Sequence, residues 1–142
     1  MDQVDQTIVA LLREDARRSY LDIGRHVHLS APAVKRRVDR LERDGVILGY
    51  TAIVDPTAFG WNAEAFVDLY CEGEVSGEAI KRAVEPEPGV LSAHTVAGEA
   101  SAMLHVQARD TKSLEQVLER IRAGAGITRT VTQVVLSTLF TR

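Results

Sequence analysis

The hydrophobic periodicity of the chain changes at Gly45, and this change constrains the fold more than any other feature. Before Gly45, apolar residues recur every three or four positions, which predicts three short helices. After it, residues 46–54 are rich in β-branched and aromatic side chains, as strands are. Pro56 and Gly60 then punctuate residues 55–60. The sequence therefore predicts two domains, 1–54 and 61–142, joined by a linker at 55–60.

Polar residues at the expected helix ends support the first domain. Asp2 and Asp5 cap a helix over about 4–13, and Ser19 caps a second helix over about 20–26. Ser30 caps a third helix that ends at a left-handed Gly45. With residues 46–54 as a small β wing, this order predicts a winged helix-turn-helix.

The second domain has the order strand, helix, strand, strand, helix, strand. The predicted segments are 65–71, a short helix capped by Ser76, 90–96, 102–108, 111–123 and 127–139. This βαββαβ order predicts a ferredoxin-like α+β fold with both helices on one face of an antiparallel sheet. The other face needs a cover, and a second copy of the sheet is the simplest one, so we expect a homodimer.

Charge and cysteine content narrow the class of protein. The net charge is −3, yet residues 17–43 carry eight basic residues against three acidic ones, an excess typical of a DNA-binding surface. A solvated helix face remains the alternative explanation of such a run. Cys71 is the only cysteine, so no internal disulfide forms and a cytoplasmic location is expected. No apolar stretch is long enough for a membrane span, and no secretory signal is evident.

A third helix that follows a short turn would enter the DNA major groove, with its N-terminal residues deepest. The expected base-edge contacts are therefore Ser30, Ala31, Ala33 and Lys35. The expected phosphate contacts are Arg36, Arg37 and Arg40 from this helix, and Arg17, Arg18 and Arg25 from the preceding elements. Few of these side chains can form the paired hydrogen bonds that identify a base, so we expect a weak sequence preference to which DNA shape contributes.

The pattern of these residues resembles the Lrp/AsnC family, the leucine-responsive and asparagine-type "feast/famine" transcriptional regulators. It includes Asp2, Asp5 and Ile8, then Leu29-Ser30, then Arg37-Val38 with Arg40-Leu41-Glu42, and Gly45-Val46-Ile47 with Gly49-Tyr50. Weaker matches follow at His94, Val96 and Gly98, and at Gly126-Ile127, Thr130 and Thr132. The resemblance implies dimers through the second domain, often assembled into octamers. It also implies a small effector, usually an amino acid, bound where dimers meet.

By the same resemblance, Gly98, Glu99, Ser101, Thr130, Thr132 and Gln133 are the expected effector-binding residues. Family members commonly carry a Gly-x-x-Asp turn between the second and third strands of this domain. Here Ser101 stands in the acidic position. An aspartate pairs with a charged amine, whereas a serine offers only a neutral hydrogen bond, so the identity of the effector stays open.

Two other functions compete with a ligand-modulated regulator. An architectural DNA-binding protein of the nucleoid shares every feature except the effector pocket. A small metabolite-binding enzyme module is the third, but the second domain shows no nucleophile–base pair and no cofactor loop. His26 and His28 lack the further ligands that a metal would need. We therefore expect no catalytic residues, no metal and no cofactor beyond the effector.

Overall fold

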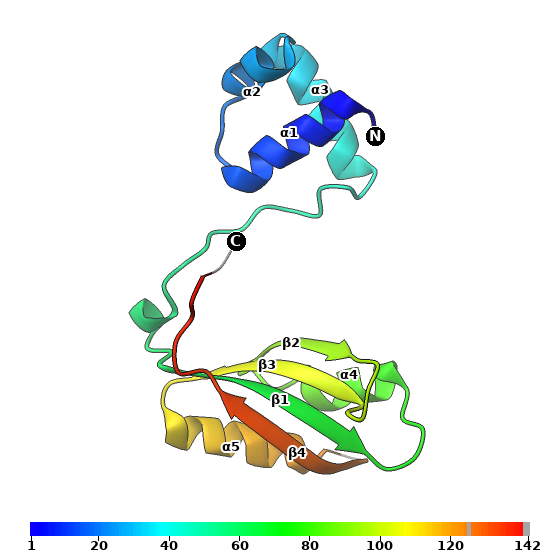
Figure 1. Ribbon diagram of the computed structural model, residues 1–142, viewed down its shortest axis with the longest axis vertical. Coiled ribbons are helices and arrows are strands. Elements are labelled where there is room, and N and C mark those ends of the chain that lie inside the picture. The colour runs from blue at the N-terminus through cyan, green and yellow to red at the C-terminus, as the bar shows by residue number, and fades with distance from the viewer. Residues whose placement is uncertain (125, 141–142) are drawn as a thin grey trace. The chain divides into compact units, whose positions relative to one another are not determined.

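The computed structural model describes residues 1–124 and 126–140 of the 142-residue chain. The chain divides into two compact units, Met1–Ile53 and Val54–Arg142 (Figure 1). The 3₁₀ helix η1 (Pro56–Phe59) follows the point of division and falls within the predicted linker. In the described part of the chain, no helix has the length and apolar character needed to cross a membrane.

The first unit contains three helices, α1 (Gln3–Glu14), α2 (Tyr20–Val27) and α3 (Ala31–Arg43). Each contributes apolar side chains to one small core, whose buried members are Ile8, Leu12, Ile23, Val34 and Val38. The Asp2 and Ser19 side chains cap α1 and α2 by accepting hydrogen bonds from backbone N–H groups one turn ahead. The predicted helix-turn-helix is thereby confirmed.

The turn between α2 and α3 depends on a close backbone contact. His28 adopts the left-handed conformation with φ 55°, and the Leu29 N–H donates to the Gly24 carbonyl at 2.9 Å. A Cβ added at Gly24 would lie 2.3 Å from the Leu29 carbonyl oxygen. Only glycine therefore lets the two helices approach at the angle that this turn fixes.

The predicted β wing is wrong for the single chain. Residues 48–55 form no strand, and Leu48 and Ile53 are 94% and 92% exposed. Strand-like residues form a strand only when another backbone supplies hydrogen-bond partners, and no described segment of this chain does so. A smaller correction concerns Ser30, which is the N-cap residue of α3 but makes no side-chain capping bond.

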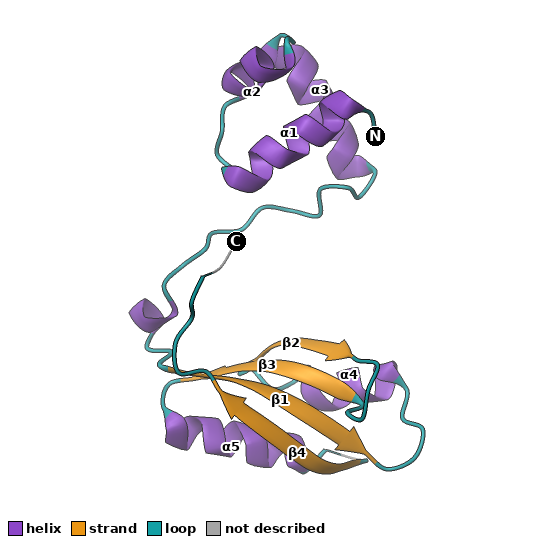
Figure 2. Cartoon of the chain, viewed as in Figure 1, coloured by secondary structure: helices purple, strands orange, loops and turns teal. Residues whose placement is uncertain are grey.

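The second unit contains a four-stranded antiparallel sheet in the order β2-β3-β1-β4 (Figure 2). Its elements are β1 (Ala63–Cys71), α4 (Gly77–Val84), β2 (Val90–Thr95), β3 (Ala102–Ala108), α5 (Thr111–Arg122) and β4 (Ile127–Val134). Alternate residues of β1 and β3 are buried against α4 and α5, which cover the same face of the sheet. The ferredoxin-like α+β prediction is confirmed.

The last strand ends earlier than the sequence predicts, at Val134 instead of residue 139. Val134 pairs with Ala65, and the Val135 N–H makes one more bond to the Glu64 carbonyl at 2.8 Å. Because β1 begins at Ala63, no partner backbone remains for the residues that follow. The strand propensity of residues 136–139 is therefore not used for pairing within the described part of the chain.

The second face of the sheet is not covered by any described element of its unit. Phe66 stacks on His105 there, with ring centroids 4.9 Å apart, and is still 39% exposed. The Arg129 guanidinium lies 3.9 Å from the Tyr70 ring centroid on the adjacent strands, and Val131 is 36% exposed. We call this surface the open sheet face. Its members include Phe66, Tyr70, His105, Arg129, Val131 and Gln133.

We expect Gly24→Ala to destabilise the first unit by about 2 kcal/mol, because the added methyl group must displace backbone and not a mobile side chain. Thermal unfolding followed by circular dichroism measures the change. Gly77→Ala is the matched control, since its Cβ would meet only the Thr95 methyl group at 3.2 Å. Equal stability of the two variants would contradict the close contact at Gly24.

Candidate nucleic-acid interface and effector site

Helix α3 has one side in the core and the opposite side in solvent. Val34, Val38 and Leu41 are buried. At about 100° per residue, Arg36 projects nearly opposite to Val34, and Arg43 lies two turns further along the same side. The amphipathic pattern of α3 therefore leaves an exposed basic stripe, Arg36 and Arg43, on the outer side of the second helix of the helix-turn-helix.

The basic side chains of this unit fall into two groups. Arg17, Arg25, Arg36 and Arg43 are exposed and form no ion pair with any described residue. Lys35 pairs with Asp39 at 2.6 Å, and this hydrogen bond raises the pKa of the lysine. Arg18 lies 3.4 Å from Glu14 and 3.7 Å from Asp22. The freely available charge is thus smaller than the count of basic residues suggests.

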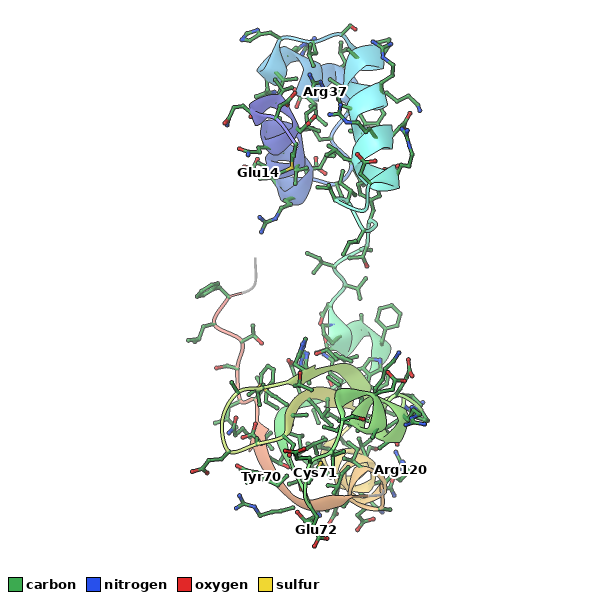
Figure 3. All side chains as sticks on the ribbon, turned by 90° about the vertical axis from the view of Figure 1, so that its right-hand side faces the viewer. Glu14, Arg37, Tyr70, Cys71, Glu72 and Arg120 are labelled. Atoms are coloured by element: carbon green, nitrogen blue, oxygen red, sulfur yellow. The ribbon has the colours of Figure 1, made fainter. Side chains whose placement is uncertain are left out.

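Arg37, which is labelled in Figure 3, and Arg40 pair with two aspartates at the start of α1. The sequence patterns do not predict this pairing. Arg37 Nη1 donates to Asp2 Oδ2 at 2.7 Å and to Asp5 Oδ1 at 2.8 Å. Arg40 Nη2 donates to Asp5 Oδ2 at 2.7 Å. The Asp5 side chain is only 1% exposed. We call these four residues the α1–α3 charge cluster.

The same carboxylates also form the capping box of α1. Asp5 N donates to Asp2 Oδ1 at 2.8 Å, and Asp2 N donates to Asp5 Oδ2 at 3.0 Å. All four carboxylate oxygens are therefore engaged. Burial alone would raise the pKa of Asp5, but the bonds from Asp2 N and Arg37 and the charge of Arg40 outweigh it and lower the pKa. The Arg37 hydrogen bond is the main cause of the lowered pKa of Asp2.

Local sequence signals identify only half of this cluster. The spacing of Asp2 and Asp5 predicts a cap, as found. Their pairing with side chains more than thirty positions away follows from the packing of α1 on α3, which no local pattern encodes. The expected base-edge residues lie at the start of α3, where Ser30 and Lys35 are exposed and Ala31 and Ala33 are partly exposed.

The residues expected to bind an effector are not gathered at one point. Gly98 and Glu99 are exposed in the turn between β2 and β3. Ser101 closes this turn against β1: its N–H donates to the Leu69 carbonyl at 2.8 Å, and its Oγ accepts from Cys71 N at 3.2 Å. The hydroxyl that replaces an acidic group is thus bonded to the end of the neighbouring strand.

The three candidates on β4 lie on different faces of the sheet. Thr130 and Thr132 pair with Leu69 and Val67 and face the helices, whereas Gln133 pairs with Phe66 and faces the open side. Thr130 Oγ1 accepts from Arg122 Nε at 2.9 Å. Thr132 lines a groove of about 460 Å³ beside α5, and its buried Oγ1 has no hydrogen-bond partner in the described part of the chain.

Charged and apolar groups from α5 line the same groove. Lys112, Glu115 and Arg122 border it, with Leu114 and Leu118 as apolar walls. Among the residues that the structure describes, no cluster of three or more His, Cys, Asp or Glu side chains is arranged to hold a metal ion.

Comparison with known proteins assigns both units to one family. The AsnC-type helix-turn-helix domain matches residues 1–42, and the Lrp/AsnC ligand binding domain matches residues 64–142. The chain belongs to the Lrp/AsnC family. It is 48% identical over 142 residues to the transcriptional regulator Rv2324 of Mycobacterium tuberculosis, covering 100% of this chain and 96% of that protein. It is 32% identical over 142 residues to the regulator LrpC of Bacillus subtilis, with the same two coverages.

Solved structures of Lrp/AsnC proteins share this fold. The feast or famine regulatory protein Rv3291c of M. tuberculosis, complexed with L-methionine, superimposes with a TM-score of 0.91 at 34% identity, covering 99% of this chain and 95% of that one. AsnC of Escherichia coli gives a TM-score of 0.90 at 24% identity, over 100% and 96% of the two chains. The chain is therefore a transcriptional regulator of the Lrp/AsnC family with a helix-turn-helix and a ligand-binding domain.

We expect Asp5→Asn to lower the stability of the first unit by about 2 kcal/mol at pH 6, because the buried carboxylate loses its charge and its ion pairs. The loss is smaller than for a fully buried ion pair because both partner arginines are partly exposed. The folded pKa of Asp5 lies below its ordinary value of 3.8. The carboxylate therefore stabilises the fold fully above that value, and this contribution is lost as the pH falls through the folded pKa.

Thermal unfolding of both proteins from pH 6 to pH 2.5 tests this expectation. The stability difference should be largest at pH 6 and should shrink below about pH 4. Asp44→Asn removes an exposed carboxylate that has no ion pair with any described residue. It is the control and should remain close to the native protein at pH 6. A difference that does not change with pH would contradict the role of the Asp5 charge.

Proposed function

We propose that this Lrp/AsnC regulator is a homodimer that binds double-stranded DNA through α3 and responds to an amino-acid effector. The observation that carries the proposal is the exposed stripe of Arg36 and Arg43 opposite the buried side of α3, in a helix-turn-helix of the AsnC type.

In this proposal the DNA-binding surface combines the start of α3 with the unpaired arginines. Ser30, Ala31, Ala33 and Lys35 lie near base edges, and Ser30 has its hydroxyl free of any capping bond. The phosphate contacts come from Arg17, Arg25, Arg36 and Arg43. Arg18 also contacts phosphate while it keeps its ion pairs with Glu14 and Asp22. Arg37 and Arg40 are also predicted from the sequence to contact phosphates, but the α1–α3 charge cluster engages both, so this surface does not include them.

The amino-acid effector is supported by a relative and by the chemistry of this chain. Rv3291c, 34% identical, has been solved with L-methionine. In this chain the groove beside Thr132 offers cations, an acid and apolar walls, which together suit a zwitterion with an apolar side chain. The turn Gly98, Glu99 and Ser101 and the Gln133 side chain lie outside this groove, and we propose that a neighbouring copy brings them into the site.

The homodimer is supported by the open sheet face. Phe66 and Val131 are apolar and partly exposed, and a four-stranded sheet with helices on one side gains stability when its second side is covered. A second copy has the same apolar surface to bury, and two-fold dimers use the same surface on both subunits.

A mobility-shift titration tests the regulatory function. The probe is the duplex upstream of the protein's own coding sequence, with and without a panel of amino acids. We expect a salt-sensitive shift that at least one amino acid strengthens or weakens. A shift that no amino acid changes would favour the architectural protein over the effector-responsive regulator. No shift at low salt would refute DNA binding.

We expect Ser101→Asp to change which amino acid alters the shift, because an acid at this turn pairs with an amine. Ser101→Ala is the matched control: it removes the hydroxyl bonded to Cys71 N without adding a charge. Isothermal calorimetry with the responsive amino acid measures the affinity. If both variants kept native affinity for every amino acid tested, the turn would not be part of the site.

We expect Phe66→Asp to convert the assembly to monomers in sedimentation velocity, because a charge on the open sheet face must be desolvated on association. Lys81→Asp, an exposed change on α4 on the covered side of the sheet, is the control and should leave the sedimentation coefficient unchanged. An assembled Phe66→Asp protein would show that the copies associate through another surface.

A further inference from the structure

We propose that Asp2 and Asp5 withhold Arg37 and Arg40 from DNA, and so limit the sequence-independent affinity of α3. The inference rests on the proposed DNA-binding role of α3 and adds a specificity-determining function to two acidic residues of α1. It assigns opposite roles to neighbouring arginines of one helix: Arg36 meets phosphates, whereas Arg37 and Arg40 do not.

The ion pairs of the basic residues on α3 separate the two groups. The helix carries five basic side chains, at positions 35, 36, 37, 40 and 43. Arg37 and Arg40 are three residues apart and share a side of the helix. Both reach α1, with three N–O distances of 2.7–2.8 Å. Arg36 and Arg43 have no acidic partner among the described residues.

The burial of Asp5 makes this pairing difficult to exchange for a DNA phosphate. Its side chain is 1% exposed, and its two oxygens accept from Arg37, Arg40 and Asp2 N. If both arginines moved to phosphates, a buried carboxylate would lose its cations, which is strongly unfavourable. The lowered pKa of Asp5 is in keeping with a carboxylate that stays ionised at neutral pH.

The consequence for DNA recognition follows from how phosphate contacts act. Each one releases counterions and adds affinity for any sequence alike. Discrimination depends on the ratio of specific to non-specific affinity, so further phosphate contacts would raise the binding of all competing sites. Holding two of the five cations of α3 internally keeps the helix positively charged while limiting its affinity for random DNA.

The salt dependence of binding to a random-sequence 30-base-pair duplex tests the inference on the full-length protein. The slope of log K against log [salt] counts phosphate contacts, at about 0.9 for each. We compare the native protein with Arg36→Gln, Arg40→Gln, Asp5→Asn and Asp44→Asn, after circular dichroism has established the temperature range in which each is folded.

We expect Arg36→Gln to reduce the slope by about 0.9 for each bound chain and Arg40→Gln to leave it unchanged. Asp5→Asn should increase the slope by about 0.9 for each released arginine and tighten binding to the random duplex severalfold at low salt. Asp44→Asn removes the same charge without releasing an arginine, so its slope should stay native. If the α1–α3 charge cluster served only to stabilise the fold, Asp5→Asn would weaken binding to the random duplex without increasing the slope.

The outcomes separate this inference from the proposed DNA-binding surface. A reduction in slope by Arg40→Gln equal to that of Arg36→Gln would overturn the inference while leaving the surface intact. A native or reduced slope for folded Asp5→Asn would also overturn it. A native slope for Arg36→Gln would instead refute the proposed surface. Should Asp5→Asn fail to fold, the Arg40→Gln comparison decides alone, since Asp5 then keeps Arg37 and Asp2 N.

Discussion

The buried carboxylate of Asp5 is the interaction on which the arrangement of the helix-turn-helix depends. It lies in the first turn of α1, where it completes a capping box, and it is also the point at which α3 is fixed by two guanidinium groups. A small three-helix unit has little apolar core, so a buried group that joins its first and last helices fixes an orientation that packing alone would leave loose. The same bonds determine which cations of α3 remain available.

The second unit relies on a different principle. Its core is apolar, and its helices cover one face of the sheet while the other face keeps aromatic and aliphatic side chains near solvent. Residues 48–55 are also exposed, and their backbone has no strand partner in the described chain. Each unit is folded, but both features leave large apolar side chains exposed to solvent in the single chain.

Local chemistry in the sequence was sufficient to predict the elements, but not the contacts between them. Caps such as Ser19 and the alternation along β1 and β3 act within a few residues, so their elements are predictable. The strand that stops at Val134 and the wing that does not form both depend on where a partner backbone lies. Arg37 looks like any exposed basic residue until α1 is packed beside it. The division of Thr132 and Gln133 between two faces follows from strand period, but which face is open depends on the helices.

The open sheet face also has a consequence for how the amount of protein governs its behaviour. Under the proposed dimer, covering Phe66 and Val131 is a second-order event, so the assembled fraction obeys mass action and rises with the total concentration of chains. The melting temperature would then rise with concentration, and dilution would separate the two copies of α3. The amount of protein that the cell makes would thereby set the fraction of assembled regulator, independently of any small molecule.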